Sequence, residues 1–293
     1  MDHNFDPNLD PNESLKTALA RNVRDALAED MGRGDWTAQL VPAERRVSAR
    51  VVAKQASLIC GRPWFDGCLL ALDARAEISW AVVEGGIVAA GAEVCRIEAN
   101  ARALLSAERP ALNFLQTLSA VASVTRRYVD AIAGLSPNPG GCRVLDTRKT
   151  LPGLRQAMKY AVRVGGGSNQ RMALWDGILI KENHIAAAGG IAAALQAAKA
   201  LEAGVGIQIE VETLDELEQA LSASATSVLL DDFSLADMQR ACQMNAGRAL
   251  LEVSGGVDLD SIRDIARTGV DRISVGKLTK DIQAVDLSLR VDA

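Results

Sequence analysis

The sequence predicts an α/β protein whose second half is built on a sheet of parallel strands. Apolar, strand-like runs alternate with helical stretches from Cys142 onward, and each run with its helix has the length of one strand–helix unit. The runs are apolar on both faces, which is typical of a parallel sheet covered by helices. Six runs fall short of the eight strands of a closed barrel. An incomplete barrel and an open, doubly wound sheet both fit this pattern, and we favour the barrel. The runs are 144–149, 177–184, 207–212, 227–232, 249–256 and 273–277.

The first half of the chain predicts a different organisation. Apolar residues recur every fourth position from Leu15 to Leu27, which indicates a helix that Gly32 ends. Residues 47–100 alternate apolar and polar side chains between repeated glycines, as in a small antiparallel, β-rich domain. A long helix is expected over 108–133, and a glycine- and proline-rich stretch at 134–141 then interrupts the chain.

These elements divide the chain into two expected domains. The N-terminal domain covers residues 1–106 and is completed by residues 280–293. The α/β barrel covers residues 107–279 and carries the chemistry.

Composition favours an ordinary enzyme of the cytoplasm and excludes several other classes. The chain of 293 residues is 48% hydrophobic and 24% charged, with no apolar run long enough for a membrane span and no signal-peptide pattern at its start. A net charge of −5 and only 3% aromatic residues argue against nucleic-acid binding. The five cysteines form no CxxC pair, so neither a zinc site nor a disulfide framework is predicted.

Positively charged side chains follow the predicted strands, where the carboxyl ends of parallel strands gather on one face. Two successive cations can hold a polyanion, and arginine binds a carboxylate or phosphate through two parallel hydrogen bonds. The glycines at 165–167 would let backbone amides approach a ligand. His3 and His184 are the only histidines, which argues against a catalytic triad or a multi-histidine metal site. The candidate cations are Arg148, Lys149, Arg171 and Lys181, joined by Arg109 of the predicted long helix, and Asn183 and His184 follow Lys181 as further candidates.

Two carboxylates and two glycine-rich turns complete the predicted site. Glu212 and Asp231 end neighbouring strands, where they could bind Mg²⁺ through water or accept hydrogen bonds from a sugar. The turns at 254–256 and 275–277 follow the last strands, the usual seat of a phosphate group in barrels. The inventory predicts a site for a phosphorylated sugar and a carboxylate. No nucleophile with an activating base is evident, so displacement at a sugar carbon by positioning and electrostatics is favoured.

Residues 147–185, TRKTLPGLRQAMKYAVRVGGGSNQRMALWDGILIKENHI, strongly resemble the signature of the quinolinate phosphoribosyltransferase family. Membership implies transfer of phosphoribose from phosphoribosyl pyrophosphate to quinolinate with decarboxylation. The products would be nicotinate mononucleotide, pyrophosphate and CO₂, in de novo NAD biosynthesis. The resemblance also implies an N-terminal α/β sandwich, an incomplete α/β barrel, a requirement for Mg²⁺, and a homodimer or higher oligomer with shared active sites. The resemblance extends to 29–38, 106–123, 210–213, 229–233, 251–256 and 273–281.

The resemblance also implies roles for individual residues. Arg148, Arg171 and Lys181 look like the ligands of the two quinolinate carboxylates, with Gln170, Asn183 and His184 beside them. Arg109 resembles an arginine contributed by the second subunit, and Lys149 resembles the lysine between the two substrates. Glu212 and Asp231 correspond to the carboxylates that engage ribose and Mg²⁺. The residues that correspond to the 5′-phosphate seat are Ser254, Gly255, Gly256, Gly276 and Lys280.

Two positions depart from the family pattern, and three other functions stay open. Gln170 replaces a histidine of many members and carries no charge, so we expect little pH dependence from it. Lys277 stands where a small residue is usual and would either contact phosphate or lie in solvent. The alternatives are a related phosphoribosyltransferase with another anionic acceptor, a Schiff-base aldolase that uses Lys181, and a catalytically silent barrel that binds a phosphorylated metabolite.

Overall fold

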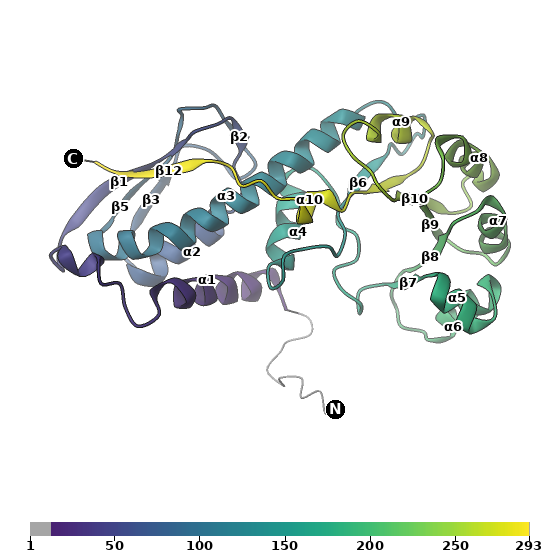
Figure 1. Cartoon of the computed structure of the whole chain (residues 1–293), viewed down its shortest axis with the longest axis horizontal. Helices are drawn as coiled ribbons and strands as arrows, with labels where there is room; N and C mark the ends of the chain where they lie inside the picture. Colours follow the sequence, from purple (N-terminus) through teal and green to yellow (C-terminus); the bar gives the residue numbers. More distant parts are fainter. Residues whose placement is uncertain (1–12, 293) are drawn as a thin grey trace. The chain divides into compact units, whose positions relative to one another are not determined.

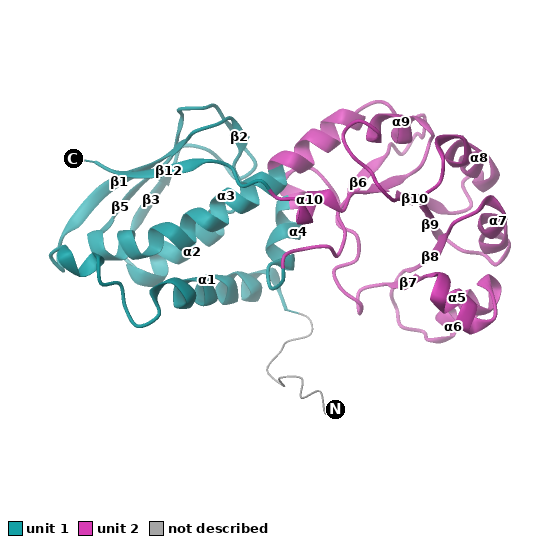
Figure 2. Ribbon diagram, viewed as in Figure 1, with its two compact units in different colours: residues 1–122, 152–161, 283–293 teal, residues 123–151, 162–282 magenta. Residues whose placement is uncertain are grey.

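The computed structural model describes residues 13–292, which form two compact units (Figures 1 and 2). Unit 1 contains the residues up to Ala122, Pro152–Ala161 and the residues from Gln283 onward, and unit 2 contains Ser123–Leu151 and Val162–Ile282. The two units divide inside a long helix. The domain boundary at 106/107 remains a prediction, and His3 lies outside the described residues.

Unit 1 is an α/β sandwich, as the sequence led us to expect. Its four-stranded antiparallel sheet has the order β12-β1-β5-β3. Helices lie along one side of this sheet (Figure 1). The strands are β1 (Arg46–Ala53), β3 (Glu77–Trp80), β5 (Glu93–Asn100) and β12 (Leu287–Val291), with a separate pair β2 (Ser57–Leu58) and β4 (Ile87–Val88). The helices are α1 (Leu15–Met31), the 3-10 turn η1 (Ala38–Leu40), α2 (Arg62–Leu72) and the first part of α3 (Ala101–Ile132), with most of α4 (Arg155–Val164).

The ends of the first helix follow the sequence signals, but the long helix begins earlier than expected. Ser14 caps α1 by accepting a hydrogen bond from the Thr17 amide, and Gly32 ends it in a left-handed-φ conformation. Helix α3 begins at Ala101 instead of 108, so the predicted start is wrong. Asn100 provides the cap, since its Oδ1 accepts from the amides of Arg102 and Ala103.

Unit 2 contains a six-stranded, fully parallel sheet in the order β6-β11-β10-β9-β8-β7. Its two edge strands are not paired with each other, so the barrel is open. Helices α5 to α9 lie along the outer side of the curved sheet (Figure 1), which favours the barrel over a doubly wound sheet. The strands are β6 (Arg143–Leu145), β7 (Ile178–Ile180), β8 (Ile207–Val211), β9 (Ser227–Asp231), β10 (Leu250–Ser254) and β11 (Arg272–Ser274). The helices are α5 (Glu182–Ala188), α6 (Ile191–Ala200), α7 (Leu214–Ser222), α8 (Leu235–Asn245), α9 (Ile262–Arg267) and α10 (Lys277–Lys280).

The register of these strands decides which side chains share the inner face of the barrel. Glu252 is opposite Leu229 on one side and Arg272 on the other, and Glu210 is also opposite Leu229. Because neighbours in register point to the same face, these residues line the interior, while alternate residues such as Val228 and Val253 pack under the helices. No helix in the described part of the chain combines the length and apolarity of a membrane span.

Candidate active site

The loop after β6 carries the first two predicted cations to the carboxyl edge of the unit 2 sheet. Thr279 donates a hydrogen bond of 2.8 Å from its hydroxyl to the Lys149 carbonyl, and the Lys149 amide donates to the Thr147 hydroxyl at 3.1 Å. The Lys149 side chain passes Gly276 so closely that a Cβ there would lie 3.3 Å from Lys149 Cδ. Lys149 therefore stands beside the predicted phosphate turn, and a side chain at 276 would push it away.

Arg148 and Arg171 lie close enough to influence each other. The Nη1 atom of Arg148 is buried. Burial, and secondly the charge of Arg148, lower the pKa of Arg171, although a guanidinium stays charged at neutral pH. Arg171 also donates from Nη1 to the Gly177 carbonyl at 2.8 Å. Two partly desolvated cations side by side favour a bound anion, which would relieve their repulsion.

A buried aspartate joins the loop after β6 to the glycine-rich loop. The Asp146 carboxylate is fully buried and accepts from the Gln170 amide at 2.9 Å and from Asn169 Nδ2 at 2.6 Å. A Cβ at Gly167 would lie 2.8 Å from Thr125 Cγ2 and 2.9 Å from Val162 Cγ1. Gly167 is thus required for close packing, which differs from the ligand-contacting role expected for the glycine run.

Lys181 forms an ion pair that the sequence reading missed. Its Nζ lies 2.8 and 3.0 Å from the two carboxylate oxygens of Glu210, which points inward from β8. The sequence did contain a signal for Glu210. In a strand, residues two apart point to the same face, so Glu210 could have been expected on the same face as Glu212. Glu210 is therefore part of the charged group at this edge.

The two predicted carboxylates lie within electrostatic reach of this ion pair. Burial raises the pKa of Asp231, as do Glu210 and Asp232, while Lys181 and Lys149 oppose the shift. Glu182 is the main cause that raises the pKa of Glu212, followed by burial and by Glu216, Asp231 and Glu210. The structure therefore brings Lys149, Lys181, Glu212 and Asp231 together at the carboxyl edge.

The carboxylates Glu210, Glu212 and Asp231 gather at this edge, and their negative charge favours a bound cation. Among residues 13–292 no group of three or more histidine, cysteine, aspartate or glutamate side chains is close enough to enclose a metal ion. Mg²⁺ commonly keeps several waters and uses one or two carboxylates together with substrate phosphates. Glu212 and Asp231 fit that mode, since both have raised pKa values that a nearby cation would lower.

The raised pKa of Asp231 predicts how the stability of the free protein depends on pH. A carboxyl group with a raised pKa in the folded state stabilises the fold when protonated, and this contribution is lost as pH rises through the folded pKa. Replacing Asp231 by Asn should therefore raise the unfolding temperature at pH 7 without Mg²⁺. Lowering the pH through the carboxyl range should shrink the difference from wild type until it vanishes. Thermal unfolding of both proteins across pH 3–7 checks this, and a less stable variant at pH 7 would contradict it.

The predicted phosphate seat follows β10 and β11. Gly255 and Gly256 have φ angles of +105° and +54°, and a Cβ at Gly255 would overlap Asp232 Oδ1. Gly276 is the N-cap residue of the short helix α10, which ends with Lys280. The Lys277 ammonium lies 3.9 Å from the Asp258 carboxylate, so Lys277 forms an ion pair at the protein surface.

The other candidates have different surroundings. The His184 ring accepts a hydrogen bond from the Lys181 amide at 3.0 Å and so belongs to the cap of α5. Asn183 is exposed on the same helix, and Arg109 is exposed on α3 in unit 1. Asn183 Nδ2 donates to Glu182 Oε1 at 3.5 Å, so both His184 and Asn183 contact residues at the start of α5.

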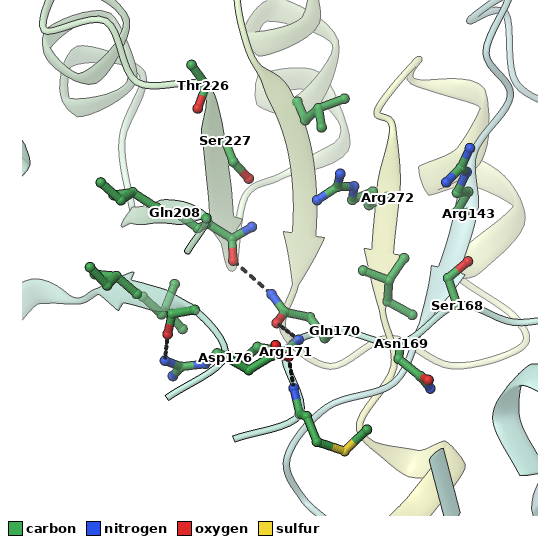
Figure 3. A pocket seen from close by; sticks show the side chains of 18 residues that line it. Arg143, Ser168, Asn169, Gln170, Arg171, Asp176, Gln208, Thr226, Ser227 and Arg272 are labelled. Atoms are coloured by element: carbon green, nitrogen blue, oxygen red, sulfur yellow. Dashed lines mark hydrogen bonds between the residues drawn. The ribbon is translucent and has the colours of Figure 1, made fainter. Parts of the chain in front are cut away.

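A cavity of about 710 Å³ lies on the inner side of the barrel (Figure 3). The cavity is lined by the first residues of several strands, including Arg143, Ser227 and Arg272, and by Gln170 and Arg171. Figure 3 shows the Gln170 amide pointing to Gln208 across this space. The cavity opens at the amino ends of the strands, and none of Lys149, Lys181, Glu212 and Asp231 is among its lining residues.

Similarity to known proteins agrees with this geometry. Residues 35–119 match the N-terminal domain and residues 121–290 the C-terminal domain of quinolinate phosphoribosyl transferase. A nicotinate-nucleotide pyrophosphorylase [carboxylating] of Mycobacterium leprae is 39% identical over 282 residues, which cover 93% of this chain and 96% of the relative. The structure of the nicotinate-nucleotide pyrophosphorylase from Francisella tularensis is 44% identical and has a TM-score of 0.91, covering 96% of this chain and 98% of that one. The chain belongs to the quinolinate phosphoribosyl transferase family.

Proposed function

We propose that this chain is a carboxylating nicotinate-nucleotide pyrophosphorylase, a pentosyltransferase of de novo NAD biosynthesis. It transfers phosphoribose from phosphoribosyl pyrophosphate to quinolinate and releases pyrophosphate and CO₂. The observation that carries the proposal is that Lys149 and Lys181 lie within electrostatic reach of Asp231 at the carboxyl edge of a parallel sheet, with Arg148 and Arg171 close enough to influence each other. Full-length similarity to relatives named for this activity supports it.

The acceptor fits the cations at this edge. Quinolinate has two adjacent carboxylates, and Arg148, Arg171 and Lys181 offer a positive group to each. Because Lys181 is already paired with Glu210, the excess positive charge is that of Arg148 and Arg171, and a monocarboxylate would engage only part of it. We therefore assign these three residues to quinolinate, with Lys149 between the acceptor and the ribose.

The chain's residues suit each step of the displacement. The quinolinate nitrogen attacks the ribose carbon as its bond to pyrophosphate breaks, and Glu212 and Asp231 stabilise the positive charge that develops on the sugar. We assign the stabilisation of the departing pyrophosphate to Lys149, and bound Mg²⁺ would neutralise that leaving group. The ring nitrogen, now quaternary, stabilises through its positive charge the electron pair left on C2 when the C2 carboxylate departs as CO₂, and C2 then takes a proton from water. Ser254, Gly255, Gly256, Gly276 and Lys280 hold the 5′-phosphate.

We further propose that the protein is a cytoplasmic homodimer with shared sites. Arg109 is exposed on α3 in unit 1, so it is available to a second copy of the chain. In that arrangement Arg109 contributes to the quinolinate site of the partner.

Turnover with quinolinate tests the function directly. With phosphoribosyl pyrophosphate and Mg²⁺, we expect nicotinate mononucleotide and CO₂ in equal amounts, and no product after chelation of the metal. Nicotinate is the control acceptor and should give no nucleotide. A reaction with nicotinate alone would mean that the cations are misassigned, and folded protein without turnover would favour another acceptor or a silent barrel.

A further inference from the structure

A line of uncharged and acidic side chains crosses the inner face of the unit 2 sheet beside the candidate site. Gln170 Nε2 donates to Gln208 Oε1 at 2.8 Å, and Gln208 Nε2 donates to Glu252 Oε2 at 2.9 Å (Figure 3 shows the first contact). The Ser274 hydroxyl donates to Glu252 Oε1 at 2.5 Å. We refer to Gln170, Gln208 and Glu252 as the polar chain.

The carboxylate at the end of the polar chain fixes its direction. The Gln208 amide turns its NH₂ group toward the Glu252 carboxyl oxygens and its own oxygen toward Gln170. Gln170 must then present its NH₂ group to Gln208, with a second, longer contact of 3.4 Å to Glu252. Its oxygen consequently faces the backbone, where it accepts from the Arg171 amide.

Burial fixes these orientations of the Gln208 and Gln170 amides. Glu252 is 0% exposed and Gln208 is 7% exposed. A buried carboxylate is costly unless its oxygens are hydrogen-bonded, so a flipped amide at Gln208 would set two oxygens against each other. The backbone amide of Gln170 is also occupied, because it donates to the buried Asp146. Both the main chain and the side chain of Gln170 are thus held by the protein.

We infer that Gln170 is a positioning residue: its side-chain oxygen holds the backbone amide of Arg171, and it does not itself bind quinolinate. The inference rests on the proposed function and revises the substrate-binding role that the sequence suggested for Gln170. Its NH₂ group and its oxygen already have partners within the fold. Gln208 and Glu252 act through Gln170, because they fix the orientation of its amide. The Arg171 side chain then extends so that Nη1 bonds the Gly177 carbonyl and the guanidinium stays within electrostatic reach of Arg148.

A double-mutant cycle between Gln170 and Gln208 tests this inference. Methionine keeps the length of glutamine but removes both hydrogen-bonding groups. Gln208→Met should raise the KM for quinolinate roughly tenfold, the effect of one lost hydrogen bond in a buried network. The kcat and the KM for phosphoribosyl pyrophosphate should stay within about twofold of wild type. Gln170→Met should give the same change, and the double variant should be no worse than either single variant.

Ser274→Ala is the matched control, because it removes another buried hydrogen bond to Glu252 and leaves the bond between Gln170 and Gln208 in place. It should lower the unfolding temperature and leave the KM for quinolinate within about twofold of wild type. A Gln170→Met effect that is much larger than that of Gln208→Met, and that adds to it, would mean direct contact with quinolinate and would overturn the inference. An unchanged KM in Gln208→Met would overturn it as well. Wild-type protein that does not convert quinolinate would instead overturn the proposed function and this inference with it.

Discussion

Replacing Arg148 by Ala should reduce kcat/KM for quinolinate by roughly 100- to 1,000-fold, the usual cost of removing one partner from a desolvated charge pair. The loss should fall on quinolinate binding, because Arg148 has a buried Nη1 and lies beside Arg171 in the cation pair. Steady-state kinetics together with calorimetric titration of quinolinate checks this. The variant should stay folded, since removal of one of two repelling cations does not disrupt the apolar core.

Arg267→Ala is a suitable control for that variant. Arg267 is an exposed arginine on α9 of the same unit and pairs with Asp264 at 2.7 Å. Its removal should leave quinolinate kinetics unchanged, because an exposed ion pair contributes little. Retained quinolinate affinity in the Arg148 variant would refute the assignment of Arg148.

The same variant also tests the shared site. A mixture of equal amounts of inactive Arg148→Ala and Arg109→Ala proteins should recover about a quarter of wild-type activity after subunit exchange, because half of the dimers are mixed and each contains one intact site. Exchange is followed with tagged subunits. Complete exchange without recovery would mean that Arg109 serves the site of its own chain or none.

Replacing Gly255 by Ala should disable the proposed phosphate seat and destabilise unit 2. The new Cβ would overlap Asp232 Oδ1, and the φ of +105° is unfavourable for any side chain. Strain of this kind costs about 1–3 kcal/mol, which corresponds to a fall in unfolding temperature of roughly 5 °C. The KM for phosphoribosyl pyrophosphate should rise at least about tenfold, because the turn must move.

Gly247→Ala separates the effect of backbone strain from the loss of the phosphate seat. Gly247 also has a positive φ, +81°, but nothing lies within 4 Å of the added Cβ, and it is in the loop before β10. This control should lose stability through backbone strain and keep its affinity for phosphoribosyl pyrophosphate. If the Gly255 variant binds that substrate normally, the 254–256 turn does not hold the phosphate.

The fold was largely predictable because it depends on local patterns. Alternation of apolar runs with helical stretches indicated the parallel sheet, and the parallel geometry then placed Lys181, Glu212 and Asp231 at one edge. The start of α3 was missed because Pro110, which is usual in a first turn, lies inside the helix. The choice between a barrel and an open sheet needed the strand order, which no local pattern contains.

The interior of the barrel was much less predictable. Gln208 and Glu252 lie within strand-like runs, and their burial depends on partners that are far away in the sequence. The same holds for Glu210, whose partner Lys181 comes from the neighbouring strand. His184 was a candidate because of its position after a strand, and the hydrogen bond of its ring to the Lys181 amide could not be read from the sequence. Pairings of this kind follow from register and side-chain direction, which a single sequence does not specify.

A crystal structure with quinolinate bound would test the central assignment most directly. We expect both carboxylates at the carboxyl edge of β6 and β7, within hydrogen-bonding distance of Arg148, Arg171 and Lys181, and no contact from the Gln170 amide. Quinolinate bound elsewhere, for example only near Arg143 and Arg272 at the amino ends of the strands, would contradict the account.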